Sequence, residues 1–221
     1  MRNDNITRLT LAGMFAALAF VCFTYLRIEI PMGGGMTGKI YIGHAFILLS
    51  ALILGAKYGA LTGAIGLSLA DILAGYTTSA PPTFLAKFLL GLAVAFIAHK
   101  VFNLAAADDK KATKIVTIAA VFGCLVNVIT EPLIRYGFKV FVLGLPHQIA
   151  YLSAINCAVS MAVSAVPSVI LAVFLYKAVQ HSILKSYKFT IPLKNEGRCF
   201  YKAAAFIFYN HCFILIYHLQ Q

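Results

Sequence analysis

The sequence predicts an all-α integral membrane protein: a six-transmembrane-helix bundle with an extra hydrophobic C-terminal segment. Three observations lead to this prediction. Hydrophobic residues make up 61% of the chain, and charged residues make up 11%, against about 25% in a soluble domain. The apolar residues come in runs that approach the roughly 20 residues needed to cross a bilayer. Short polar or basic segments separate these runs.

Six apolar runs follow one another, and each is expected to form one helix. The expected helices cover residues 10–26, 40–55, 58–74, 82–102, 115–134 and 147–179. Pro82 suits the first turn of the fourth helix. The sixth run contains Pro167 and is long enough to break there or to extend past the membrane. Residues 27–39, which are rich in glycine, are expected to form a loop.

These helices define a membrane domain over residues 1–188, followed by an extension over residues 189–221. The extension contains an apolar run from Cys199 to Leu219 that carries Lys202 and Asn210. A seventh helix, an interfacial amphipathic segment and a non-native extension all fit this composition, and the sequence leaves the three open.

Basic residues predict the orientation of the helices, because cytoplasmic segments are enriched in lysine and arginine. Placing both ends of the six-helix core in the cytoplasm puts most of the basic residues inside. The inside segments then hold Arg2, Arg8, Lys57, Lys100, Lys110, Lys111, Lys114, Lys177, Lys185 and Lys188. The outside segments hold Arg27, Lys39, Arg135 and Lys139.

Two charged residues, Asp71 and Lys87, fall inside apolar runs, at similar depth on the outer side. A charge in hydrocarbon costs about 3 kcal/mol or more, so such residues face the protein interior and are usually paired. We therefore expect Asp71 and Lys87 to form a buried structural ion pair.

Further polar residues fall at the same outer depth in the fifth and sixth helices. Asn127 and Glu131 lie one turn apart on one face of the fifth helix. Since lipid offers no hydrogen bonds, polar faces must meet each other or a cavity. The sequence therefore predicts a substrate-binding cavity that opens to the outside, although hydrogen bonds between packed helices are the alternative. The candidate substrate-binding residues are Asn127, Glu131, Gln148, Tyr151, Asn156, Lys87 and His44.

No catalytic, cofactor or metal motif accompanies these residues. The chain lacks the G-x-x-x-x-G-K-[ST] phosphate loop, H-E-x-x-H and G-x-S-x-G, and its cysteines form no Cys-x-x-Cys pair. We therefore expect neither an enzyme nor a cofactor. Two alternatives remain: a stand-alone proton-coupled transporter that uses Asp71, Lys87 or Glu131, and an intramembrane enzyme that uses Glu131 and His147 as acid and base.

In the cytoplasmic half of the first expected helix, small residues cover one face. Ala12 and Ala16 form a small-xxx-small spacing, which lets another helix approach closely.

Residues 41–92 carry a resemblance to a known family. The runs YIGHAFILLSALILGAKYGALTGAIGLSLADILAGY and APPTFLAKFLLGL resemble the substrate-binding S component of energy-coupling factor (ECF) vitamin transporters. The similarity is strongest to the riboflavin, hydroxymethylpyrimidine and pyridoxine branch. It extends over residues 9–185 and is looser in the fifth and sixth helices.

The resemblance implies a six-helix bundle in a bacterial plasma membrane that captures a small water-soluble vitamin from outside. It implies partners, namely a transmembrane T component and two ATPase subunits. It also implies that Ala12 and Ala16 match the family's docking motif for the T component, and that residues 27–39 form a lid over the ligand. The family does not share one substrate, so the vitamin itself does not carry over.

Overall fold

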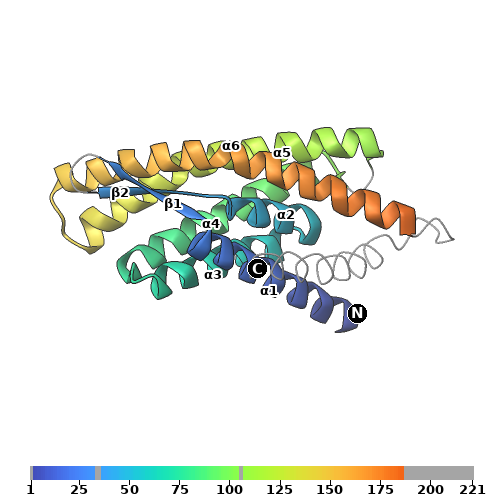
Figure 1. Cartoon of the computed structure of the whole chain (residues 1–221), viewed down its shortest axis with the longest axis horizontal. Coiled ribbons are helices and arrows are strands. Elements are labelled where there is room, and N and C mark those ends of the chain that lie inside the picture. The colour runs from blue at the N-terminus through green and yellow to red at the C-terminus, as the bar shows by residue number, and fades with distance from the viewer. Residues whose placement is uncertain (1, 33–35, 105–106, 187–221) are drawn as a thin grey trace, which may run out of the picture.

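Helices of very different lengths make up most of the chain in this computed structural model, which describes residues 2–32, 36–104 and 107–186. In chain order the elements are α1 (Arg2–Tyr25), β1 (Arg27–Met32), β2 (Met36–Tyr41), α2 (His44–Leu54), α3 (Ala56–Leu73), η1 (Thr77–Ser79), α4 (Ala80–Ala95), η2 (Phe96–Val101), α5 (Asp109–Gly137), η4 (Phe138–Val142) and α6 (His147–Ser186). Figure 1 shows the long α5 and α6 side by side, with the shorter helices gathered along them. The predicted extension over residues 189–221 lies outside the described residues.

Among the described residues, four helical segments have the length and composition of a membrane span. They cover residues Arg8–Tyr25, Thr77–Val101, Asp109–Val142 and His147–Gln180. Large apolar side chains such as Leu133, Val166 and Phe174 lie more than half exposed on α5 and α6, as expected for surfaces that face lipid. The structure is therefore that of a helical membrane protein.

The second expected span is shorter than the sequence suggested. α2 has 11 residues, which corresponds to a length of about 16 Å, well short of a bilayer core. All of its residues except Phe46 are buried, and it contacts α1, α3, α4 and α6. Its apolar sequence therefore reflects burial inside protein rather than contact with lipid, and residues 40 and 41 belong to β2 instead.

Close helix packing depends on glycine and alanine. Gly66 of α3 lies against α1, where an added Cβ would come 2.7 Å from the Ala16 carbonyl oxygen. Gly91 of α4 lies against α3, where an added Cβ would come 2.6 Å from Ala60 Cα. Larger residues at either position would force the helices apart. The connection between α2 and α3 is Gly55 alone, which has a φ of 81° that favours glycine.

β1 and β2 pair as an antiparallel hairpin, where a loop over residues 27–39 was expected. Arg27 pairs with Tyr41 and Glu29 pairs with Lys39 across the two strands. The prediction of a loop was wrong for these strands because glycines dominate the composition of the segment. Strand pairing satisfies the backbone groups of β2, which packs against α6.

The hairpin lies at the end of the bundle where α5 turns into α6 (Figure 1). α2 and α4 begin at this end, and α3 and α5 finish here. The functional site is built from these helix ends and the hairpin.

Candidate functional site

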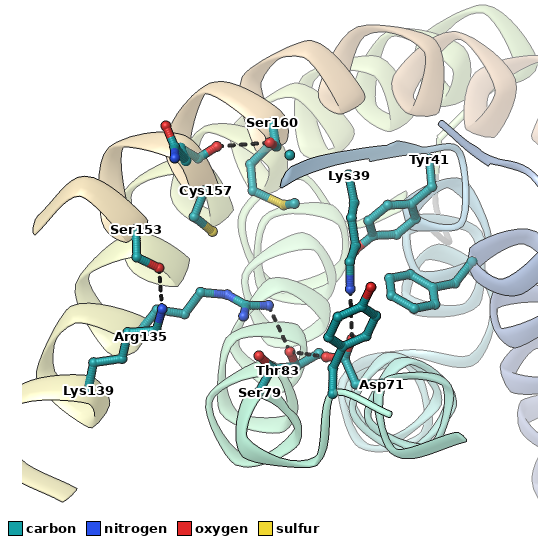
Figure 2. A pocket seen from close by; sticks show the side chains of 15 residues that line it. Lys39, Tyr41, Asp71, Ser79, Thr83, Arg135, Lys139, Ser153, Cys157 and Ser160 are labelled. Carbon is teal, nitrogen blue, oxygen red and sulfur yellow. Dashed lines mark hydrogen bonds and ion pairs between the residues drawn. The ribbon is translucent and has the colours of Figure 1, made fainter. Parts of the chain in front are cut away.

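A cavity of about 320 Å³ lies between the hairpin and the ends of α3 to α6. The volume is at the small end of the range of about 300–1,000 Å³ typical of ligand pockets. The cavity is lined by Phe23, Gly38, Lys39, Tyr41, Asp71, Tyr76, Ser79, Thr83, Arg135, Lys139, Ser153, Asn156, Cys157, Ser160 and Met161. Figure 2 shows the labelled members of this set around the cavity.

One wall of the cavity is formed by α5 and α6 and is rich in hydrogen-bond donors. Arg135 lies at the end of α5 and Lys139 lies four residues later in η4, and Lys139 Nζ donates to Ser153 Oγ of α6 at 2.5 Å. Asn156 lies one turn further along α6, and its buried Nδ2 has no hydrogen-bond partner in the part of the chain that the structure describes. Such an orphan donor is rare in protein interiors, and here it lies at the edge of a cavity.

The opposite wall is aromatic and is formed by Tyr41 of β2, Phe23 of α1 and Tyr76, which lies between α3 and η1. Lys39 Nζ lies 3.1 Å from the centroid of the Tyr76 ring and 5.2 Å from that of Phe23. The Tyr41 ring meets Phe23 edge-on, with the centroids 4.9 Å apart. Burial lowers the pKa of Lys39 to about 8, against the opposing attraction of Asp71. Because this value lies above neutral pH, Lys39 is mostly cationic at pH 7.

Beneath the cavity lies a fully buried ionic cluster. Lys87 and Glu131 are both 0% exposed, and Lys87 Nζ donates to Glu131 Oε2. Lys87 Nζ also lies 3.4 Å from Asn127 Oδ1, and Asn127 Nδ2 donates to Glu131 Oε2 at 3.2 Å. Arg135 donates to the other oxygen, Glu131 Oε1, at 3.0 Å. The carboxylate of Glu131 therefore forms ion pairs with two cationic side chains, Lys87 and Arg135.

His44 connects this cluster to the hairpin. Its Nε2 lies 2.8 Å from Lys87 Nζ and 3.2 Å from Tyr41 Oη. Since an ammonium group can only donate, Nε2 accepts from Lys87 and the ring proton is assigned to Nδ1. Nδ1 is buried and has no hydrogen-bond partner among the described residues.

Arg135 connects the cluster back to the cavity floor. Its Nη2 donates to Thr83 Oγ1 at 2.9 Å, and Thr83 Oγ1 donates to Asp71 Oδ2 at 2.6 Å. Asp71 Oδ1 lies 4.0 Å from Lys39 Nζ, at the limit of an ion pair. These contacts, several of which Figure 2 draws, make a chain that starts at Lys39 and ends at Tyr41, two residues apart on β2; we call it the polar ring. Its members are Lys39, Asp71, Thr83, Arg135, Glu131, Lys87, His44 and Tyr41.

The predicted ion pair between Asp71 and Lys87 is wrong in its partners. Lys87 pairs with Glu131 of α5, whereas Asp71 meets Lys39 and Thr83. Similar depth placed Asp71 and Lys87 at one level, but depth says nothing about the direction in which each helix presents its side chain.

The predicted substrate-binding residues separate into three groups in the structure. Asn156 lines the cavity. His44, Lys87, Asn127 and Glu131 come together, but beneath the cavity and not on its lining. Gln148 and Tyr151 are exposed on α6, away from the cavity, and Tyr151 is 62% exposed.

Ala12 and Ala16 lie in a contact between α1 and α3 and do not form an open face. Ala12 is 6% exposed, its carbonyl accepts from Thr62 Oγ1 at 3.4 Å, and Ala16 lies against Gly66. This position corrects the expectation that the pair faces a partner. The small residues that α1 does expose are Gly13 and Ala17.

Sequence analysis did not identify the residues that give the cavity its positive charge. It assigns Lys39, Arg135 and Lys139 to outside segments, where they help to determine the orientation of the helices in the membrane. Arg135 had a detectable signal, because it continues the four-residue spacing of Asn127 and Glu131. Tyr76 gave no comparable signal.

The arrangement suits binding rather than bond-making chemistry. Glu131 and His147, the acid and base of the enzyme alternative, have different partners: Glu131 is buried with Lys87 and Arg135, whereas His147 Nδ1 lies 3.0 Å from Tyr136 Oη in an exposed contact. Within the described ranges, no three His, Cys, Asp or Glu side chains come together to hold a metal ion.

Comparison with known proteins identifies the family. A family model described as ECF-type riboflavin transporter, S component, matches residues 3–181. The chain belongs to this family. An ECF S component is a substrate-binding subunit of a membrane transporter and not an enzyme.

The fold agrees with this assignment. A solved structure of the S component of a bacterial ECF transporter superposes on this S component with a TM-score of 0.56 at 20% sequence identity. The superposition covers 82% of this chain and 98% of the solved one. A comparison with curated proteins finds no significant match.

Proposed function

We propose that this S component captures a small water-soluble vitamin from outside a bacterial plasma membrane for import by an ATP-driven partner complex. The observation that carries this proposal is the cavity of about 320 Å³ at the hairpin end, with an aromatic wall and a donor-rich wall. Convergent polar groups beside aromatic rings are typical of sites for small polar ring compounds. The family description favours riboflavin, and pyridoxine and hydroxymethylpyrimidine are the other candidates.

The membrane domain we propose is a six-helix bundle in which α2 lies inside, surrounded by other helices. The opening of the cavity toward the outside is supported by the basic residues, which concentrate at the opposite end of the bundle. The hairpin covers one side of the cavity and takes the place of the expected lid, because Gly38, Lys39 and Tyr41 belong to β2.

The partners we propose are a T component and two ATPase subunits, as the family implies. The chain lacks a phosphate loop, which agrees with ATP hydrolysis in a separate subunit. On α1, the exposed small face of Gly13 and Ala17 is the surface open to close helix approach. A bulky Ala17→Trp substitution should weaken co-purification with the T component and leave vitamin binding intact.

The direct test is to extract the purified full-length chain and identify the bound small molecule by mass spectrometry, then titrate the apoprotein with it. The Asn156→Ala variant should bind roughly tenfold more weakly, because it loses a donor at the cavity. Gln148→Ala is the matched control, since it removes an amide from an exposed position of the same helix. If the two variants bind alike, the cavity is not the site.

Uptake by cells separates this proposal from a proton-coupled carrier. ATP-driven import should persist when an uncoupler collapses the proton gradient while cellular ATP is maintained. Loss of uptake under those conditions would favour the carrier.

A further inference from the structure

The charges around the cavity do not balance. Lys39, Arg135 and Lys139 reach its lining, and Asp71 is the carboxylate among the lining residues. Asp71 lies 4.0 Å from Lys39 and accepts from Thr83. Among the described residues, no carboxylate lies within 4.0 Å of Lys139 Nζ, whose partner is the neutral hydroxyl of Ser153.

The buried layer beneath the cavity does not supply the missing negative charge. Glu131 pairs with both Lys87 and Arg135. Nearby on the hairpin, Arg27 and Glu29 pair with each other at 3.2 Å and add no net charge. The cations of the lining, together with Lys87, therefore share only the carboxylates of Asp71 and Glu131.

The surplus of positive charge lies on one side of the cavity. Arg135 extends from the end of α5 and Lys139 from η4, opposite the aromatic rings beside the hairpin (Figure 2). Ser153 and the unpartnered amide nitrogen of Asn156 face them from α6. This wall offers guanidinium, ammonium, hydroxyl and amide donors together, which is the donor set that binds carboxylate and phosphate oxygens.

A low-dielectric wall with unbalanced cations raises the local concentration of anions and holds them strongly. We propose that the ligand of this S component is an anion. Its carboxylate or phosphate group contacts Arg135 and Lys139, and its ring lies against Tyr76 and Phe23. This inference rests on the proposed function, and it replaces the neutral candidates named there with ring compounds of the same kind that carry a carboxylate or a phosphate.

The test uses ligands that share a ring and differ in charge. Riboflavin is compared with riboflavin 5′-phosphate, and pyridoxine with both pyridoxine 5′-phosphate and 4-pyridoxate, by calorimetric titration of the full-length apoprotein. We expect an anionic member to bind at least about tenfold more tightly than its neutral counterpart, as for a charge-assisted hydrogen bond. Comparison of the affinities for pyridoxine 5′-phosphate and 4-pyridoxate shows which anionic group of the ligand the site prefers.

Lys139→Gln is the informative variant, because it removes the cation that has no carboxylate partner. It should weaken binding of the anion roughly tenfold and weaken binding of the neutral member much less. Lys100→Gln is the matched control, since Lys100 is exposed in η2, which follows α4 at the opposite end of the bundle. A second measurement needs no variant: binding of the anion should weaken between low and high salt, and binding of the neutral ligand should not.

The outcomes distinguish this inference from the proposed function. Tighter binding of a neutral member, with no effect of Lys139→Gln, overturns the anionic ligand and leaves vitamin capture standing. Binding of no member of any series overturns both.

Discussion

At the scale of single residues, the buried pair of Lys87 and Glu131 carries a stability prediction. Both side chains are 0% exposed. Removing one partner leaves a buried charge uncompensated, which costs about 3–5 kcal/mol. We expect Glu131→Gln to lower the unfolding free energy by this amount, because it leaves the buried Lys87 and Arg135 without their carboxylate. Lys87→Met should cost less, because Glu131 keeps its ion pair with Arg135. The double variant should lose less than the sum, as measured by thermal or denaturant unfolding in detergent.

Asp71→Asn provides the matched control, because it also exchanges a carboxylate for an amide. Asp71 pairs with Lys39 and reaches Lys87 only through Thr83, Arg135 and Glu131, so its coupling with Lys87→Met should be much smaller than that of Glu131→Gln. A coupling between Asp71 and Lys87 as large as that between Glu131 and Lys87 would contradict the arrangement of the polar ring.

Lys39 predicts how ligand affinity depends on pH. Its pKa of about 8 reflects burial, with Asp71 and Glu29 raising the value and Arg27 and Arg135 lowering it. An anionic ligand favours the protonated form, so binding takes up protons near pH 8 and affinity falls as the pH rises through this range. Calorimetry in buffers of different ionisation enthalpy measures this uptake. Lys39→Arg keeps the charge and should flatten the profile, and a steep profile in that variant would assign the titration elsewhere.

The residues of the site could be predicted only in part. Intramembrane depth grouped Lys87, Asn127 and Glu131 correctly, because polar groups at one level must satisfy each other. It could not predict the pairing, which depends on how α3, α4 and α5 are rotated about their axes. Arg135 lies at the end of α5 and Lys139 lies in η4. A basic residue at such a helix end looks the same in the sequence whether it lines a cavity or only sets the orientation of the helix in the membrane.

At the scale of elements, the contact between α1 and α3 predicts that two alanines differ in how much a larger side chain destabilises the protein. Ala12 is 6% exposed against α3, whereas Ala17 is exposed. We expect Ala12→Leu to overpack the contact and to cost about 1–3 kcal/mol of unfolding free energy. Ala17→Leu should change stability by less than about 0.5 kcal/mol. Equal losses in thermal unfolding would show that the two faces of α1 are packed alike.

The positions of the helices were easier to predict than whether each helix contacts lipid or is buried in protein. The starts of α3, α4 and α6 agree with the expected ranges to within two residues, because Gly55, the prolines near residue 82 and the loop before His147 mark them. α2 was expected as a helix but interpreted as a membrane span, since an apolar run looks the same in lipid and in a protein core. The hairpin was not predicted. The prolines Pro132 and Pro167 lie inside α5 and α6, which continue through them.

At the scale of the whole molecule, the arrangement predicts which end faces outward. Ile28 is 66% exposed on the hairpin, and Lys100 is exposed at the opposite end of the bundle. In a cysteine-free background, the Ile28→Cys variant should react with an impermeant maleimide on intact cells. The Lys100→Cys variant should react only after the membrane is opened. The reverse pattern would place the cavity on the cytoplasmic side.

The polar ring has a kinetic consequence. Its members Lys39 and Tyr41 belong to the hairpin, so the hairpin cannot lift without separating Lys39 from Asp71 and Tyr41 from His44. A molecule in the cavity lies behind these contacts, and we expect its residence time to follow the frequency of hairpin opening. A partner that pulls on the hairpin would therefore release the ligand quickly, even when the closed cavity retains the ligand for a long time.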